Sequence, residues 1–332
     1  MKGKIFITRR LPGSAVAMLK KTGLSVSMYP RSDRAIPRAE LLRKVKGCTG
    51  IISLLTDKMN DQVFGAAGPQ LRVVSNYAVG YDNIDVAEAA KRKIKVGNTP
   101  CDEVSEAVSE AAMTMILACA TKIIQANNFT KAGKYKTWDP LFFNGPSLVG
   151  KTLGIVGLGR IGSGLAHRAA DGFGLNIVYF DLTRRPEFEK RFNARYLTIE
   201  QLLRRSDFIS LHVPLLKSTY HLISTKQLKM MKKSAYLINT SRGPVVDELA
   251  LLKALKKKEI AGAALDVYEC EPAIDCIPSD SMRLKDFDNV IMTPHTASAT
   301  TEAREKMAMV AAENIIAALR GRQMPGEVII KT

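Results

Sequence analysis

The sequence predicts an α/β protein of two domains, each built on a doubly wound parallel sheet. Three observations predict this fold class: the length of 332 residues, short apolar runs that alternate with helical segments, and a second series of the same kind from residue 152 onward. A single hydrophobic core stops growing at about 250–300 residues, so a chain of this length is expected to divide in two. Apolar runs bounded by turn residues are typical of parallel strands whose two faces are both buried.

The first series of elements lies before residue 100. Its predicted strands cover residues 5–7, 24–28, 51–54 and 72–75, and its predicted helices cover residues 14–21, 38–45, 61–66 and 86–92. One long helix is then expected from residue 105 to residue 124, because Ser105 and Glu106 open an apolar helical pattern. Its most apolar part, residues 111–120, is shorter than the roughly 20 residues of a membrane span, so we expect a buried helix.

The second series predicts about six strands, at residues 152–156, 176–180, 207–211, 235–238, 262–265 and 289–292. A strong helix over residues 301–319, ended by Gly321, closes the chain. Because no linker or repeat separates the two series, we expect the tail to return to the first domain. The expected domains are therefore residues 1–100 with 296–332, and residues 101–295.

Composition excludes several classes of protein. Hydrophobic residues make up 46% and charged residues 24%, which is ordinary globular usage and argues against disorder. The net charge of +17 is spread in short groups without interleaved aromatic residues, so basic faces that attract anionic substrates are favoured over a nucleic-acid site. Residues 1–8 lack the pattern of a signal peptide, and five scattered cysteines are expected to be reduced thiols. We therefore expect a cytoplasmic protein with no membrane, nucleic-acid or metal partner.

The densest motif is Gly157-Leu-Gly-Arg-Ile-Gly162, which directly follows a predicted strand and opens a predicted helix. In this context Gly157 permits the tight turn, Gly159 lets the backbone approach a pyrophosphate, and Gly162 lets helix and strand pack closely. Asp181 ends the next predicted strand, where a carboxylate can accept hydrogen bonds from the ribose hydroxyls. The motif predicts a dinucleotide-binding Rossmann domain.

The carboxylate of Asp181 would repel a 2′-phosphate, so NAD is the expected cofactor. Arg184 and Arg185 follow closely and could hold that phosphate, so NADP stays open as an alternative.

Six segments in order resemble the D-isomer-specific 2-hydroxyacid dehydrogenase family, particularly its glyoxylate and hydroxypyruvate reductase branch. They are YAVGYDNID at 77–85, GLGRIG at 157–162, LHVP at 211–214, NTSRGPVVD at 239–247, ALDVYECEP at 264–272 and TPHTASAT at 293–300. The resemblance implies a flavodoxin-like substrate domain beside the NAD-binding domain, interconversion of a small 2-keto acid and its D-2-hydroxy acid with NAD(H), and a homodimer.

The resemblance assigns the catalytic set to Arg242, Glu271 and His295, and the chemistry agrees with it. Reducing a 2-keto acid needs a cation for the carboxylate and the developing alkoxide, and an acid to protonate that alkoxide. The planar fork of Arg242 suits the first task. Among four histidines, His167 lies on the helix after the glycine motif, His212 ends a strand near the presumed adenine site, and His221 follows in a loop. His295 remains: it follows the predicted strand at residues 289–292, at the edge where α/β sheets bind ligands, and Glu271 would orient its ring.

The resemblance also implies the remaining contacts. On the cofactor side they are Val108, Gly157, Gly159, Arg160, Ile161, Gly162, Asp181, His212, Val213, Pro214, Thr240 and Asp266. On the substrate side they are Leu55, Val79, Gly80 and Arg242. Phosphite dehydrogenases of this family carry a lysine where this chain has Val79, which makes phosphite oxidation improbable here. The alternatives left open are a D-lactate or D-3-phosphoglycerate dehydrogenase and an NAD-sensing protein similar to the family's transcriptional corepressors.

Overall fold

The computed structural model describes residues 2–271 and 283–329. The chain divides into two compact units, one made of Met1–Val104 with Ala299–Thr332 and the other of Ser105–Ser298. These boundaries lie a few residues beyond those expected at 100 and 295. Both units are α/β structures with parallel sheets, as predicted.

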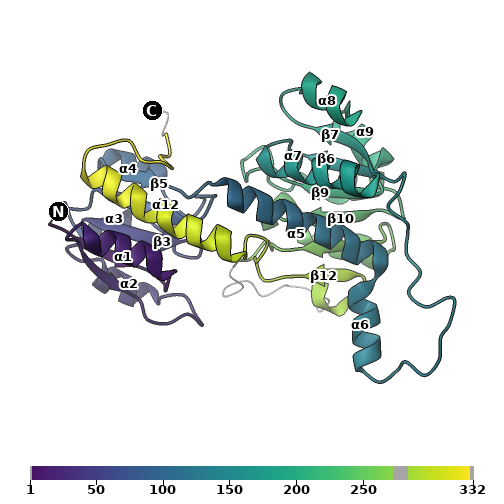
Figure 1. The fold of residues 1–332 in the computed structure, drawn as a ribbon, viewed down its shortest axis with the longest axis horizontal. Helices are drawn as coiled ribbons and strands as arrows, with labels where there is room; N and C mark the ends of the chain where they lie inside the picture. Colours follow the sequence, from purple (N-terminus) through teal and green to yellow (C-terminus); the bar gives the residue numbers. More distant parts are fainter. Residues whose placement is uncertain (1, 272–282, 330–332) are drawn as a thin grey trace. The chain divides into compact units, whose positions relative to one another are not determined.

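The first unit contains a five-stranded parallel sheet in the order β2-β1-β3-β4-β5. This order is that of the flavodoxin-like fold. Helices α2, α3 and α4 cover one face around a core that includes Phe6, Val63 and Phe64, while α1 and α12 lie along the other face (Figure 1). The elements are β1 (Lys4–Ile7), α1 (Gly13–Lys21), β2 (Ser25–Met28), α2 (Arg38–Lys44), β3 (Gly50–Leu54), α3 (Asp61–Ala67), β4 (Val73–Tyr77), α4 (Val86–Lys91), β5 (Lys95–Gly97) and α12 (Thr301–Leu319).

The helix α12 brings the end of the chain back to the first unit. Its N-terminus is capped by Thr300, whose hydroxyl accepts a hydrogen bond from the Ala303 amide. Asn314 is fully buried on this helix; its Nδ2 donates to the Asn98 carbonyl at 2.8 Å, and its Oδ1 accepts from the Gly326 amide at 2.9 Å. A buried amide with its hydrogen bonds satisfied fixes α12 and the following residues on the sheet.

The second unit contains a seven-stranded parallel sheet in the order β12-β11-β10-β9-β6-β7-β8. This is the doubly wound Rossmann order with one further strand, and it changes direction between β6 and β9. Apolar clusters cover both faces. The elements are α5 (Asp102–Thr121), α6 (Ile123–Lys131), β6 (Thr152–Val156), α7 (Arg160–His167) continued by a π-helical turn (Arg168–Gly172), β7 (Asn176–Phe180), α8 (Pro186–Phe192), β8 (Arg195–Tyr196), α9 (Ile199–Arg205), β9 (Phe208–Leu211), α10 (Thr225–Met230), β10 (Tyr236–Asn239), a 3₁₀ turn (Gly243–Val245), α11 (Glu248–Lys256), β11 (Gly262–Leu265), a second 3₁₀ turn (Leu284–Asp286) and β12 (Val290–Met292).

The structure differs from the sequence prediction at one helix and two strands. The single helix expected over residues 105–124 is two helices, because Lys122 takes a left-handed conformation with φ of 54° and ends the ladder between α5 and α6. The strands β5 and β8 were missed, since two or three residues are too few to show a period.

Within the described residues α5 alone is long and apolar enough to cross a membrane. In the fold 61% of its most apolar stretch is buried, so its length and composition are weak evidence for a membrane span.

The cysteines differ in state. Cys48, Cys101 and Cys119 are buried free thiols. Cys270 takes part in a disulfide bond, so the expectation of a reduced thiol is wrong for this residue. Cys276 lies outside the described residues.

Candidate active site

The glycine-rich turn after β6 has the geometry that a dinucleotide needs. Gly157 has a φ of 95°, and a β-carbon there would lie 2.7 Å from the His212 carbonyl oxygen. A β-carbon on Gly162 would lie 2.2 Å from the Gly157 carbonyl oxygen, so this glycine allows α7 to pack on the turn. At Gly159 a β-carbon would meet no described protein atom within 4 Å. The open side of the turn therefore fits a pyrophosphate, with the first amides of α7, at Arg160 and Ile161, beside it.

Asp181 follows β7 and faces this turn. Its Oδ2 accepts a hydrogen bond from the Leu158 amide at 2.7 Å, and its Oδ1 accepts from the Leu182 amide at 2.6 Å. Each carboxylate oxygen keeps a free lone pair, so the side chain is held where a ribose hydroxyl could donate to it.

The neighbouring Arg184 forms an ion pair with another carboxylate, that of Glu189. Its guanidinium donates to both oxygens of Glu189 on α8, each at 2.8 Å. The same carboxylate accepts from the Tyr179 hydroxyl at 2.9 Å. Hydrogen bonding from Arg184 lowers the pKa of Glu189, which keeps the pair ionised. Arg184 would have to leave this bidentate pair to reach a 2′-phosphate, which further favours NAD.

Further predicted cofactor residues follow the strands β9, β10 and β11. His212 follows β9, and burial lowers the pKa of its ring to about 4. Thr240 follows β10 and is buried, with a hydroxyl that has no partner among the described residues. Such an orphaned polar atom at the ligand edge of the sheet is consistent with a bound cofactor. Val213 and Pro214 continue the chain after His212.

Asp266, directly after β11, organises the segment that carries His295. Its carboxylate accepts hydrogen bonds from the Thr293 hydroxyl at 2.5 Å and from the amides of Thr296 and Ala297 at 2.8 Å each, and its backbone carbonyl accepts from the His295 amide at 2.9 Å. Asp266 is 1% exposed, so these contacts balance a buried carboxylate.

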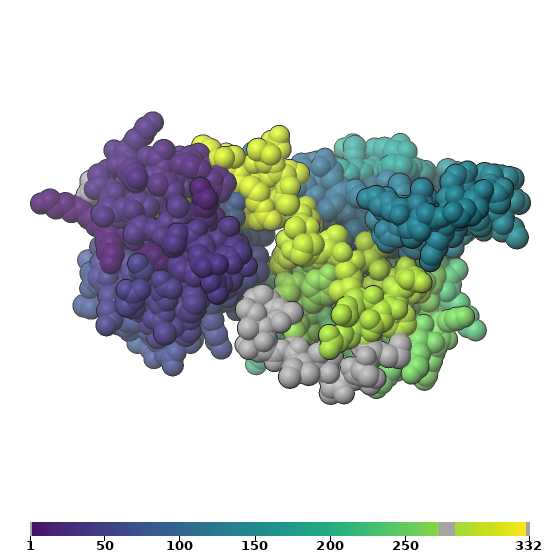
Figure 2. Space-filling view, turned by 90° about the horizontal axis from the view of Figure 1, so that it is seen from below, coloured from purple at the N-terminus to yellow at the C-terminus, as the bar shows by residue number. Residues whose placement is uncertain are grey.

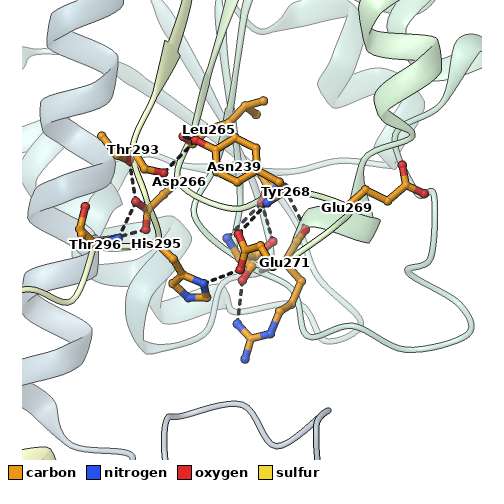
Figure 3. A network of polar contacts seen from close by, with 12 residues as sticks. Asn239, Leu265, Asp266, Tyr268, Glu269, Glu271, Thr293, His295 and Thr296 are labelled. Atoms are coloured by element: carbon orange, nitrogen blue, oxygen red, sulfur yellow. Dashed lines mark hydrogen bonds and ion pairs between the residues drawn. The ribbon is translucent and has the colours of Figure 1, made fainter. Parts of the chain in front are cut away.

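Glu271 lies between His295 and the backbone of its own loop (Figure 3). Its Oε2 is 2.6 Å from His295 Nδ1, and its Oε1 accepts from the Tyr268 amide at 2.7 Å. The contact to Nδ1 leaves Nε2 of the imidazole for a substrate. His295 has a φ of 53°, a conformation that is uncommon outside glycine and that often marks a functional position.

Arg242 comes from the segment after β10, which packs on the loop that carries Glu271. Asn239 holds that segment, since its Nδ2 donates to the Arg242 carbonyl at 2.9 Å and its Oδ1 accepts from the Ser241 amide at 3.0 Å. Gly243 packs directly on the loop of Glu271, because a β-carbon there would lie 1.7 Å from the Tyr268 carbonyl oxygen. The second unit thus brings together a guanidinium and a histidine–carboxylate pair, the groups that reduction of a keto acid requires.

The predicted substrate residues Leu55, Val79 and Gly80 belong to the first unit, after the strands β3 and β4. Asn98 Nδ2 donates to the Val79 carbonyl at 2.6 Å, and Asn76 Nδ2 donates to the Gly80 carbonyl at 2.8 Å. These two bonds fix the peptide planes of the turn, whose amides are the predicted carboxylate donors.

Val108, the last predicted cofactor residue, is buried on α5 in the second unit. The adjacent Ser109 hydroxyl donates to the Ile161 carbonyl at 3.0 Å, so this part of α5 lies against the start of α7.

Sequence reasoning missed four residues that support this site, namely Gly243, Glu248, Glu269 and His221. Gly243 and Glu269 lie inside quoted motifs, one residue after Arg242 and two residues before Glu271. A glycine beside a proposed catalytic residue is a signal of close backbone packing, and it could have been used. Nothing in the sequence links His221 to Glu269, which is 48 positions away.

Comparison with known proteins agrees with this geometry. The family profile described as D-isomer specific 2-hydroxyacid dehydrogenase, NAD binding domain, matches residues 113–297. The glyoxylate reductase of Thermococcus litoralis is 48% identical over 98% of this chain and 96% of its own length.

Solved structures are equally similar in fold. A protein from Thermus thermophilus matches with a TM-score of 0.89 and 37% identity, over 98% of this chain and all of its own. The NADPH-dependent glyoxylate/hydroxypyruvate reductase of Sinorhizobium meliloti, solved with NADP and malonate, matches with a TM-score of 0.82 and 30% identity, over 99% of this chain and 97% of its own. On this evidence the chain belongs to the D-isomer specific 2-hydroxyacid dehydrogenase family and is an NAD-dependent enzyme of it.

Proposed function

We propose that this enzyme reduces glyoxylate to glycolate with NADH, and hydroxypyruvate to D-glycerate as a second reaction. The observation that carries the proposal is the 48% identity to a glyoxylate reductase along nearly the whole chain, combined with the contact between Glu271 and His295 in the cofactor-binding unit. The nicotinamide supplies the hydride for this chemistry.

The side chains of the second unit perform the remaining steps. Arg242 binds the substrate carboxylate with its planar fork and polarises the keto oxygen, so negative charge that develops there is stabilised. His295 Nε2 donates a proton to that oxygen, and Glu271 holds the imidazole at Nδ1 in the orientation that this transfer needs. Each cycle consumes one keto acid, one hydride and one proton.

The other residues position the two ligands. Asp266 accepts from the nicotinamide carboxamide and Val108 packs near the ring, while the Thr240 hydroxyl and the chain at His212, Val213 and Pro214 contact the dinucleotide. In the first unit the amides of Val79 and Gly80 bind the substrate carboxylate and Leu55 lines the pocket.

A panel of keto acids tests this function. Loss of NADH or NADPH absorbance is followed with glyoxylate, hydroxypyruvate, pyruvate and 3-phosphohydroxypyruvate, and chiral chromatography identifies the glycerate enantiomer. We expect the highest kcat/KM with glyoxylate and NADH. Preference for pyruvate or for the phosphorylated acid would instead indicate a D-lactate or D-3-phosphoglycerate dehydrogenase, and NADH binding without any turnover would indicate a corepressor-like protein.

We also propose a homodimer, formed through the segment from α6 to β6. Here Trp138, Leu141 and Val149 are 72%, 78% and 76% exposed. An edge-to-face contact between Phe129 and Phe142, with ring centroids 5.3 Å apart, orders the segment on α6. Figure 2 shows α6 and the chain after it, in dark teal, uncovered at the surface of their unit. Large apolar side chains gathered in one exposed segment are typical of a protein interface.

Light scattering with size-exclusion chromatography tests the dimer. The Leu141→Glu variant should elute at the monomer mass of 36.4 kDa, whereas the parent should have twice that mass. Leu182→Glu is the matched control, since Leu182 is 91% exposed but lies outside the patch. A monomeric parent would contradict the proposal.

The cytoplasm is the proposed location, because it supplies the NADH that the reaction consumes. Cell fractionation followed by immunoblotting would test it.

A further inference from the structure

A second histidine–glutamate pair lies beside the first. His221 Nε2 is 2.6 Å from Glu269 Oε1, and Glu269 is separated from Glu271 by a single residue. Figure 3 shows Glu269 and Glu271 pointing to opposite sides of their loop. His221 has a φ of 50°, so both paired histidines hold the left-handed conformation that non-glycine residues rarely adopt. Strain of this kind persists where surrounding contacts impose it.

The contacts of His221 connect the two segments that carry the proposed catalytic groups. Its amide donates to the Pro244 carbonyl at 2.8 Å, two residues beyond Arg242. Its ring joins Glu269 through Nε2, and its Nδ1 lies 4.0 Å from Asp247 Oδ2. Asp247 in turn caps α11 by accepting from the Ala250 amide. The imidazole therefore lies between one carboxylate on the segment of Arg242 and one on the loop of Glu271.

Glu248 strengthens the same connection. Its Oε1 accepts from the Glu269 amide at 2.5 Å, and its own amide donates to Glu269 Oε2 at 3.3 Å. Burial raises the pKa of Glu248, and the charges of Glu269 and Glu271 raise it further. The carboxylates of Asp247, Glu248 and Glu269 thus lie close together, and His221 contacts Glu269 through Nε2. Among the described residues this group does not have the arrangement of a metal site.

We propose that His221 is a positioning residue of the active site: through Glu269 and Asp247 it holds the loop of Glu271 against the segment of Arg242. The inference rests on the proposed reduction of a keto acid. Glu271 can contact His295 only while His221 holds Glu269 on the other side of the loop.

The His221→Asn variant tests the inference, since asparagine tolerates the left-handed backbone but cannot replace the imidazole. We expect kcat with glyoxylate to fall about 10-fold or more, because a misplacement of about 1 Å can cost 10²-fold. The NADH dissociation constant should stay at the parental value. The solvent deuterium isotope effect on kcat should rise, because proton donation from a displaced His295 becomes slower. Glu269→Gln should act in the same direction.

Two further measurements separate positioning from general stability. The His221 side chain is 30% exposed, so imidazole can enter the space left in a His221→Gly variant, and adding it should restore kcat. His167→Asn is the matched control, because His167 pairs with Asp171 at 3.3 Å on the exposed end of α7 and should tolerate the change. Loss of activity that only follows the folded fraction, with an unchanged isotope effect and no imidazole rescue, would overturn the inference.

A crystal structure of His221→Asn provides a readout that is independent of turnover. The distance between Glu271 Oε2 and His295 Nδ1, 2.6 Å in the parent, should increase. An unchanged distance between Glu271 and His295 would overturn the inference, whether or not the parent is active. A parent that reduces no keto acid would contradict only the proposed function.

Discussion

Gly243 and Tyr268 lie backbone to backbone, so close that a β-carbon on residue 243 would be 1.7 Å from the Tyr268 carbonyl oxygen. This contact sets the separation between the segment of Arg242 and the loop of Glu271. The obstacle is a backbone atom and cannot rotate away, in contrast to the end of a flexible side chain. The proposed catalytic geometry therefore depends on a residue that has no side chain.

Gly243→Ala should consequently damage both activity and stability. The two segments must separate, so kcat/KM should fall by about 10-fold or more, and the midpoint of thermal unfolding should drop. Gly172→Ala is the matched control, because a β-carbon there meets no described atom within 4 Å and its φ is not in the left-handed region. Steady-state kinetics and thermal denaturation of both variants check the prediction; equal behaviour of the two would contradict it.

Arg242→Lys should lower kcat/KM by about 10²-fold or more, since losing a transition-state donor costs roughly 2.7–4 kcal/mol. Lysine keeps the charge but lacks the fork that binds carboxylate and keto oxygen together. NADH affinity, measured by fluorescence titration, should barely change. Parental kcat/KM in this variant would mean that the guanidinium is structural.

His295→Asn should mainly depress kcat, because the substrate still docks on Arg242 while its developing alkoxide lacks a proton donor. Glu271→Gln should weaken the same step, because a neutral amide holds the imidazole at Nδ1 less strongly than the carboxylate that now lies 2.6 Å away. Comparing kcat with KM across a keto-acid titration checks both variants. A large rise in KM at unchanged kcat would place these residues in substrate binding instead.

Asp181→Ser should shift preference toward NADPH, and adding Glu189→Gln should shift it further by releasing Arg184 from its bidentate pair. A new hydrogen bond from a guanidinium to a phosphate is worth about 1.5–3 kcal/mol, so the second step should approach about tenfold in the NADPH to NADH ratio of kcat/KM. Glu187→Gln in the Asp181→Ser background is the control, since Glu187 is exposed on the same helix. No additional shift from Glu189→Gln would show that Arg185 alone faces the phosphate.

The half-buried His212 should make the fold acid-sensitive. Its folded pKa is about 4, below the ordinary 6.5, so above pH 6.5 the ring is neutral in both states and contributes nothing to the pH dependence. As pH falls from 6.5 to about 4, only the unfolded chain takes up the proton, and stability declines. The loss is at most about 3 kcal/mol, because the ring keeps some solvent contact. Urea denaturation of the parent and of His212→Asn at several pH values between 4 and 6.5 checks this prediction. The same dependence of the free energy of unfolding on pH in both proteins would contradict it.

The sequence predicted the parts of this molecule that depend on local pattern. The strand β6 and the turn at Gly157 follow from an apolar run and a glycine spacing, and helix α12 was predicted with its observed bounds. The end of α5 could not be predicted, because a left-handed Lys122 has no compositional sign. The partnership of His221 with Glu269 joins residues 48 apart and is created by tertiary packing alone.

The return of α12 to the first unit has a consequence for biosynthesis. The NAD-binding unit is contiguous, Ser105–Ser298, and can fold as soon as it has left the ribosome. The first unit begins earlier in the chain, yet one face of its sheet is covered by α1 alone until α12 has been synthesised, because α12 packs on β3, β4 and α1. The N-terminal sheet therefore exposes apolar surface during synthesis, and we expect a chaperone to bind the nascent chain at this sheet.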